Sequence, residues 1–168
     1  MSSWEIDDEA GWVEDDTTTG DVLIVDDDPS IRAMLGFVFD DAGFTVTEAV
    51  DGREALEVLR TTPPALMVLD LMMPEVDGVA VLRRRREEGL APGTRVLVLT
   101  AKTDTKDAVW CWELGADEYL IKPVDPDRFL REGQALLKRT PDELRRRREV
   151  GLAEARRLDA MEAAFKID

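Results

Sequence analysis

The chain of 168 residues is long enough for one domain with a hydrophobic core plus appendages, and too short for two domains of ordinary size. Hydrophobic residues make up 44% of it and charged residues 35%, a balance typical of a globular protein rather than a disordered or membrane one. The net charge of −15 disfavours nucleic acid as a partner, the single Cys111 permits no internal disulfide, and no apolar run suits a signal peptide or a membrane span. We therefore expect a cytoplasmic protein that binds neither nucleic acid nor membrane.

Residues 1–20 carry seven acidic side chains and no lysine or arginine, and they end in a Thr-Thr-Thr-Gly stretch. This composition predicts a disordered acidic N-terminal tail. Two tryptophans, Trp4 and Trp12, are unusual in such a tail. They are candidates for anchoring a partner or for folding back onto the domain.

From Asp21 onward, short apolar runs alternate with helical patterns five times. The runs are residues 22–25, 44–48, 65–69, 96–99 and 118–121, and the helical patterns cover residues 29–42, 51–60, 79–88, 105–114 and 125–139. Runs that are apolar throughout, rather than at every second residue, are typical of strands buried on both faces of a parallel sheet. The pattern predicts an α/β domain over residues 21–139, with a five-stranded parallel sheet that is doubly wound by helices.

Polar residues follow the apolar runs, where parallel strands end at one edge of the sheet and ligands usually bind. They are Asp26 and Asp27 after the first run, Asp70 after the third, Thr100 after the fourth and Lys122 after the fifth. Three neighbouring carboxylates repel one another, so they require raised pKa values or a bound cation, and their hard oxygen atoms suit Mg²⁺. Asp70 is then the candidate nucleophile toward a phosphoryl group, and Thr100 and Lys122 can hold its oxygens. Taken singly, these residues could be a helix cap, a strand-end hydroxyl and a solvated lysine, but their joint pattern favours a site.

Four segments have a specific order and spacing: Val25–Pro29, Asp70–Gly78, Leu99–Ala101 and Gly115–Pro123. With them, residues 21–139 resemble a response-regulator receiver domain over their whole length. The resemblance implies the flavodoxin-like receiver fold and a phosphorylation-dependent signalling switch of a two-component system, with a histidine kinase or a phosphotransfer protein as partner. A phosphorelay intermediate or phosphate sink without a state-dependent output is the alternative.

The resemblance also assigns a phosphoacceptor and a metal site. It implies that Asp70 is the phosphoacceptor, Asp27 a direct Mg²⁺ ligand, Asp26 a ligand through water, and the backbone carbonyl of Met72 a further ligand. A competing class, the haloacid-dehalogenase-type phosphatases, also attacks phosphate with a strand-end aspartate but needs a second aspartate two residues later as general acid. Here that position is Met72, so we expect a phosphoacceptor that is not a turnover enzyme.

The resemblance further implies a switch. Thr100 and Lys122 would contact the phosphoryl group, and the peptide bond after Lys122 resembles one that the family holds in the cis form. Tyr119 would be the aromatic residue that turns inward with Thr100 on activation. Val109 and Trp112 are spaced to share a helix face, which by resemblance joins Tyr119 in the surface that senses phosphorylation. This surface is a candidate for contact with a partner or a second copy, although large apolar residues are more often core.

Residues 140–168 are too few for an independent domain, so we expect no DNA-binding effector domain there. A threonine, a proline and two acids at 140–143 predict the start of an extra C-terminal helix. Leu144, Gly151, Leu158 and Phe165 recur every seven residues, but Gly151 weakens the helix and the stripe is too short to predict a coiled coil. The helix could dock on its own domain, pair with a partner or second copy, or bind nucleic acid. Eight basic and seven acidic side chains over residues 139–168 disfavour the last interpretation.

Overall fold

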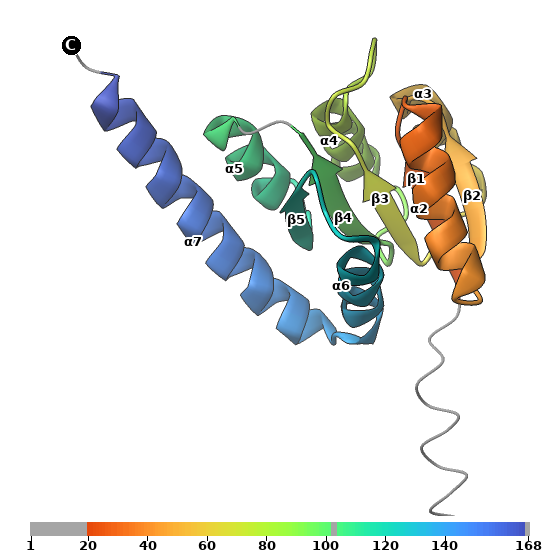
Figure 1. Ribbon diagram of the computed structural model, residues 1–168. Helices are drawn as coiled ribbons and strands as arrows, with labels where there is room; N and C mark the ends of the chain where they lie inside the picture. Colours follow the sequence, from red (N-terminus) through yellow and green to blue (C-terminus); the bar gives the residue numbers. More distant parts are fainter. Residues whose placement is uncertain (1–19, 102–103, 167–168) are drawn as a thin grey trace, which may run out of the picture.

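The computed structural model describes residues 20–101 and 104–166 as a five-stranded parallel sheet covered by helices on both faces (Figure 1). The strand order is β2-β1-β3-β4-β5, which confirms the predicted doubly wound α/β fold. The strands are β1 (Asp21–Val25), β2 (Thr45–Ala49), β3 (Leu66–Leu69), β4 (Arg95–Thr100) and β5 (Glu118–Ile121). The predicted tail, with Trp4 and Trp12, lies outside the described residues except for Gly20.

The helices are α2 (Pro29–Asp41), α3 (Gly52–Thr61), α4 (Gly78–Glu88), α5 (Thr105–Glu113), α6 (Pro126–Lys138) and α7 (Pro141–Phe165). Alternate residues of the central strands face two separate apolar cores. Leu23 and Met67 belong to the core under α3, α4 and α5, whereas Ile24 and Val68 belong to the core under α2 and α6. Burial on both faces explains why these strands are apolar at every residue.

The core under α2 and α6 is centred on three aromatic rings. Phe39 meets Phe44 and Phe129 edge to face, in each case with ring centroids 5.3 Å apart. Gly133 lets α6 approach this cluster, since a Cβ atom there would lie 2.8 Å from Cζ of Phe39. This packing fixes α6 against β4, the strand that ends at Thr100.

Strand β2 departs from the expectation that the strands are apolar throughout. Thr45, Thr47 and Glu48 are exposed, and within the strand only Ala49 is fully buried. The physical reason is its position at the edge of the sheet, where it pairs with β1 alone. Its predicted existence is nevertheless confirmed, with a start one residue later than expected.

Helix α7 begins with a capping box, in which the Thr140 and Glu143 side chains each accept a backbone N–H of the other residue. It packs against α5 and β5 of its own domain (Figure 1). Gly151 and Ala155 are buried along α7, and Leu144 joins the core under α2 and α6. These positions confirm the interpretation of a helix docked on its own domain. None of the helices within residues 20–166 is both long and apolar enough to cross a bilayer.

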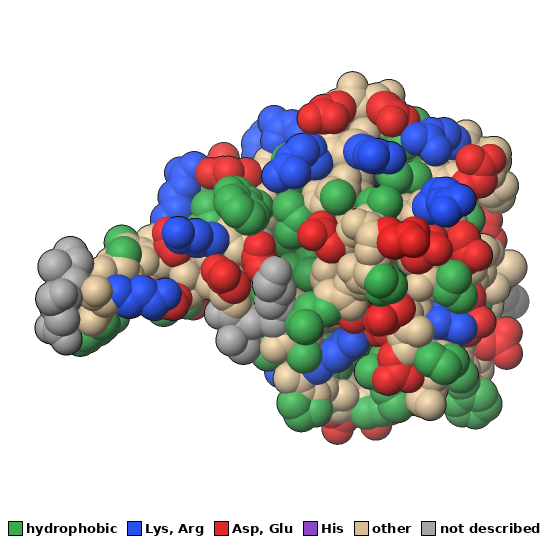
Figure 2. All heavy atoms as spheres, turned by 90° about the horizontal axis from the view of Figure 1, so that it is seen from above, with side chains coloured by type: hydrophobic (Ala, Val, Ile, Leu, Met, Phe, Trp, Pro, Cys, Tyr) green, Lys and Arg blue, Asp and Glu red, His purple; other side chains and the backbone are tan. Residues whose placement is uncertain are grey.

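The docked face occupies only part of α7. Leu158, Met161 and Phe165, in the second half of the helix, are exposed, and Phe165 retains 84% of its accessible surface. Seen from the edge where the strands end, this part of α7 projects from the body of the molecule (Figure 2). The seven-residue stripe is thus divided between a buried first half and an exposed second half.

Candidate functional site

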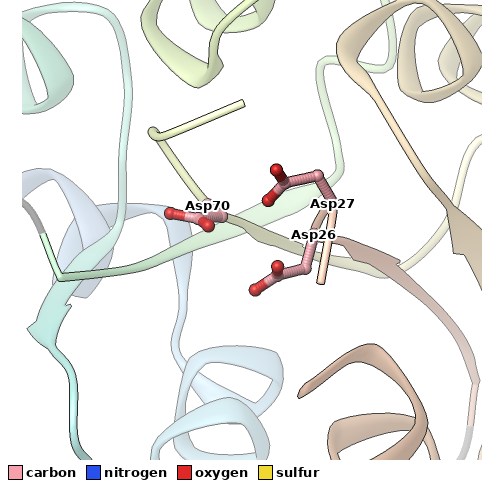
Figure 3. A group of neighbouring side chains, drawn as sticks. All are labelled: Asp26, Asp27 and Asp70. Atoms are coloured by element: carbon pink, nitrogen blue, oxygen red, sulfur yellow. The ribbon is translucent and has the colours of Figure 1, made fainter. Parts of the chain in front are cut away.

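Three carboxylates meet at the edge of the sheet where β1 and β3 end. Asp26 and Asp27 follow β1, Asp70 follows β3, and one oxygen of each carboxylate lies within 4.8 Å of the others. Figure 3 shows the side chains of Asp26 and Asp27 extending toward Asp70. Asp26 and Asp70 are 2% and 6% exposed, whereas Asp27 is open to solvent. The predicted carboxylates are therefore together, with one of the three accessible to a hydrated ion.

Lys122 supplies the positive charge of this group. Its Nζ atom donates to Oδ2 of Asp26 at 2.8 Å and to Oδ2 of Asp70 at 3.3 Å. Burial alone would lower the pKa of Lys122, but the hydrogen bond to Asp26 and the charges of Asp70 and Asp26 outweigh burial and raise it. Lys122 is therefore a fixed cation, and its peptide bond to Pro123 is cis, as the resemblance implied.

One ammonium group does not balance three carboxylates. Burial raises the pKa of Asp70, and the charge of Asp26 raises it further, although the backbone N–H of Met72 and the charge of Lys122 lower it. The ionised form of Asp70 is thus disfavoured in the absence of a further cation. The donor set of three hard carboxylate oxygens fits a small hard cation such as Mg²⁺.

The loop after Asp70 is held close to the site. The Met72 N–H donates to Oδ1 of Asp70 at 3.1 Å, and the Met72 side chain is 54% exposed. A Cβ atom at Gly78 would lie 2.4 Å from the carbonyl oxygen of Asp70, so only glycine permits this approach. Glu75, in the same loop, has a left-handed backbone with φ of 64°, which is uncommon for a residue with a side chain.

Thr100 and Tyr119 lie on the neighbouring strands. Thr100 is fully buried at the end of β4, and its carbonyl accepts the Lys122 N–H at 2.8 Å, which ties the ends of β4 and β5 together. Tyr119 is half-buried on β5, opposite Val98 of β4. Burial raises the pKa of the Tyr119 phenol, so it remains protonated at neutral pH. Thr100 and Lys122 therefore lie at the carboxylate edge of the sheet, whereas Tyr119 lies two residues further back and packs against the core under α3, α4 and α5.

Sequence reasoning missed Arg32 on α2. Its NH1 group donates to the backbone carbonyl of Asp26 at 2.8 Å, and its Nε atom lies 3.8 Å from Oε2 of Glu48. The signal was present in the sequence, because a cation in the first turn of a helix is opposed by the helix dipole and so indicates a specific partner. Arg32 holds the backbone that carries two of the three carboxylates.

Residues 22–132 match the family described as the response regulator receiver domain. The chain belongs to this family. It is 41% identical over 128 residues to the DNA-binding response regulator MtrA of Mycolicibacterium smegmatis, an alignment that covers 76% of this chain and 55% of MtrA. It is 40% identical over 119 residues to the DNA-binding dual master transcriptional regulator RpaA of Synechocystis, covering 71% of this chain and 49% of RpaA.

Among solved structures, the chemotaxis protein CheY4 of Vibrio cholerae superposes with a TM-score of 0.65 at 32% identity, covering 71% of this chain and 99% of CheY4. The chain therefore has the CheY-like receiver fold, with α7 as an extra C-terminal helix. It spans about half the length of the curated response regulators that it matches. Their names describe a DNA-binding response regulator and a DNA-binding transcriptional regulator, which weakens the expectation that nucleic acid is not a partner.

The predicted contact surface of the receiver domain is largely covered by α7. Trp112 is only 7% exposed, because its ring packs against Gly151 and the Arg147 guanidinium lies 5.0 Å from its centroid. Val109 and Tyr119 are half-buried. In this structure Trp112 is buried against α7, which agrees with the alternative that large apolar residues are core. Its predicted role in contact with a partner or a second copy stays a prediction, and a partner reaches this ring only if α7 moves.

Proposed function

We propose that this receiver domain is a phosphorylation-dependent switch that accepts a phosphoryl group on Asp70 from a histidine kinase or phosphotransfer protein. The observation that carries the proposal is the position of Asp70, buried with Lys122 at 3.3 Å and with two further carboxylates in reach of one cation. The proposal includes a cytoplasmic location, because ATP, the source of a kinase's phosphoryl group, is there.

In the proposed transfer, an Asp70 carboxylate oxygen attacks the phosphorus atom of a phosphohistidine. A P–O bond forms, the P–N bond breaks, and the imidazole nitrogen leaves with the electron pair. Lys122 already faces the carboxylate that becomes the acyl phosphate, so its charge is in place for the phosphoryl oxygens. Thr100 lies at the end of β4, where its hydroxyl can contact the same oxygens.

Mg²⁺ fits the carboxylate group and, when bound, neutralises part of the negative charge that would otherwise repel the phosphoryl group. Asp26, Asp27, Asp70 and the backbone carbonyl of Met72 would hold it. We further propose that the chain is not a turnover enzyme, because the product of its reaction is its own Asp70. The position two residues later is Met72, which cannot act as the general acid of a phosphatase.

The output that we favour is a change in α7. Thr105 begins α5 five residues after Thr100, and its hydroxyl contacts Oδ1 of Asp159 and Oε2 of Glu162, each at 2.8 Å. A movement of Thr100 toward a phosphoryl group therefore acts on a segment that holds α7. Phosphorylation would then shift the population between docked and released α7, and would change the protein surface that the domain presents.

Acetyl phosphate and Mg²⁺ provide the first test. We expect a phosphorylated species of the full chain on a phosphate-affinity gel, none for Asp70→Asn, and the wild-type level for Asp40→Asn, an exposed aspartate on α2. Phosphate uptake by Asp70→Asn would overturn the assignment of the phosphoacceptor.

Beryllofluoride, which mimics the phosphoryl group on Asp70, separates the outputs. Faster amide exchange in α7, or a change of mass in light scattering, that Asp70→Asn removes would support an output through protein contact. If beryllofluoride changes neither the amide exchange of α7 nor the mass, the result would favour the phosphorelay or sink alternative. Because the relatives are DNA-binding proteins, a third measurement is binding to a DNA duplex with and without beryllofluoride. If beryllofluoride is required for this binding, DNA contact replaces protein contact as the output.

A further inference from the structure

Six arginines line two adjoining hollows between α4, α5 and the first half of α7. The hollows measure about 450 and 560 Å³, and they share Arg86 and Arg148 in their walls. We call them together the arginine groove; its arginines are Arg85, Arg86, Arg95, Arg145, Arg148 and Arg156. The acidic residues in the same walls are Glu113, Asp117 and Glu149. The groove therefore carries an excess of positive charge, although the whole chain has a net charge of −15.

Much of this positive charge is not neutralised by carboxylates. Arg85 donates to the backbone carbonyls of Ala91 and Thr94, and Arg95 donates to those of Gly93 and Arg139. A carbonyl satisfies a hydrogen bond but leaves the net charge in place.

Three of the groove arginines form ion pairs with carboxylates. Arg148 lies 3.5 Å from Asp117, Arg156 lies 2.9 Å from Glu113, and Arg145 pairs with Asp142. The last two pairs are exposed to solvent, which weakens them. Arg86 lies beside them and donates to the backbone carbonyl of Glu113. An anion that enters the groove therefore meets arginines whose charge is still available.

Apolar side chains also line the groove. Leu90, Pro92, Leu114, Leu144 and Trp112 are among its lining residues, and we call them its apolar floor. Arginines beside an apolar floor suit a segment that carries both carboxylates and large aromatic side chains, because guanidinium groups pair with the former and stack on the latter. A free inorganic anion would leave the apolar floor unused.

The chain itself contains such a segment at residues 1–19, which carry seven of its acidic side chains, no basic ones, and both Trp4 and Trp12. The described chain resumes at Gly20, beside the start of β1, and two hydrogen bonds join the strand starts there. The Ala65 N–H donates to the carbonyl of Asp21, and the Arg95 N–H donates to that of Ala65. Asp21 and Arg95 are thus two strand spacings apart, about 10 Å.

Residues 1–19 are long enough to reach the groove from Gly20, since 19 extended residues can span about 60 Å. In Figure 1, α7 also begins at the lower edge of the molecule, where the strands begin. We propose that the arginine groove binds residues 1–19 of the same chain, with carboxylates on the arginines and a tryptophan over the apolar floor. The bound segment would bridge α4, α5 and the start of α7, and so would hold α7 on the domain. The proposal is independent of phosphorylation.

A spin label on residue 3 tests the proposal in the full chain. Ser3→Cys provides the attachment point, because the native Cys111 is fully buried, and mass spectrometry verifies a single label. In NMR spectra, we expect the amide signals of Gly89, Gly93 and Gly115 around the groove to lose most of their intensity compared with a sample in which the label is reduced. Amide signals of α2, on the opposite face of the sheet, should keep their intensity.

Charge reversal gives a matched pair of variants. Arg86→Glu with Arg145→Glu should restore the lost signals, whereas Arg53→Glu with Arg131→Glu, two exposed arginines on α3 and α6, changes the net charge equally and should not. Raising the salt from about 0.15 M to about 1 M, which shortens the screening length from about 8 Å to about 3 Å, should also restore them.

Three results would overturn the proposal. The first is intensity loss centred on another face, and the second is loss that survives Arg86→Glu with Arg145→Glu. The third comes from a mixture in which one set of chains carries the spin label and the other the isotope. Broadening of groove signals in that mixture would mean that the segment of a second copy occupies the groove.

Discussion

Replacing Gly151 by alanine tests whether α7 is docked against α5 in solution. A Cβ atom at this position would lie 2.5 Å from both Cε2 and Cζ2 of Trp112 and 2.7 Å from its Cη2. Contacts below 3.0 Å require atoms to shift, and a ring beneath Arg147 and α7 cannot turn away as the end of a flexible side chain can. The docked helix must therefore move outward or the ring must be displaced.

The size and sign of the effect distinguish a docked helix from a free one. Alanine in place of glycine stabilises an exposed helix position by about 1 kcal/mol. Inserting a methyl group into a filled contact costs about 1–3 kcal/mol. If α7 is docked, Gly151→Ala changes the free energy of unfolding by between about zero and a loss of about 2 kcal/mol, and Gly151→Leu, with similar helix propensity and more volume, loses more. If α7 is free, both variants gain about 1 kcal/mol of helix stability.

Urea unfolding followed by circular dichroism and by tryptophan fluorescence measures this order. Ala153→Gly, at an exposed position of the same helix, is the control and should lose about 1 kcal/mol through helix propensity alone. Docking predicts that stability falls from glycine to alanine to leucine at position 151. A rise in the free energy of unfolding for both alanine and leucine would refute it.

Two further predictions concern the ends of the switch. Thr105→Val removes the hydroxyl between Asp159 and Glu162, so amide exchange in the last two turns of α7 should accelerate about 5-fold, the equivalent of about 1 kcal/mol for one hydrogen bond. The control Thr47→Val, on exposed β2, should leave this exchange unchanged. Equal exchange rates in the two variants would contradict the contact. Burial raises the pKa of Asp70 above its unfolded value, so the stability that this group contributes is complete below about pH 3.9 and is lost as pH rises through the folded pKa. Without Mg²⁺ at pH 7, Asp70→Asn should therefore unfold at a higher urea concentration than the wild type, and this difference should disappear near pH 4. Added Mg²⁺ should stabilise the wild type more than the variant. If Asp70→Asn is less stable than the wild type at pH 7 without Mg²⁺, the reasoning is wrong.

The fold could be predicted because its signals are local. Strands β1, β3 and β4 are buried on both faces, so they are uninterrupted apolar runs, and helices between them follow from alternation. Strand β2 gave the weakest signal, because an edge strand lacks the burial that makes a run apolar. The carboxylates and Lys122 could be predicted for a related reason, since parallel strands bring their carboxyl ends to one edge whatever the residues between them.

The position of α7 could not be predicted, because it depends on contacts between residues distant in the sequence. In the sequence, Gly151 is a helix-weakening residue that interrupts an apolar stripe. In the structure it is the point of closest approach to Trp112, and the absence of a side chain is what permits the contact. The same applies to Arg147, which belongs to a basic run in the sequence but pairs with Glu118 at 2.6 Å and covers Trp112 in the fold.

Three of the contacts that hold α7 lie on elements that the receiver domain would use to report phosphorylation. Thr105 begins α5, Trp112 lies near the end of the same helix, and Glu118, which Arg147 binds, directly precedes Tyr119. A state of Asp70 that shifts any of these elements must change the free energy of docking. Coupling free energies are reciprocal, so release of α7 must change the equilibrium between the two states of the phosphorylation site by the same factor. If phosphorylation of Asp70 acts on α7 as proposed, whatever binds or frees the helix would also set how readily the domain adopts its phosphorylated conformation.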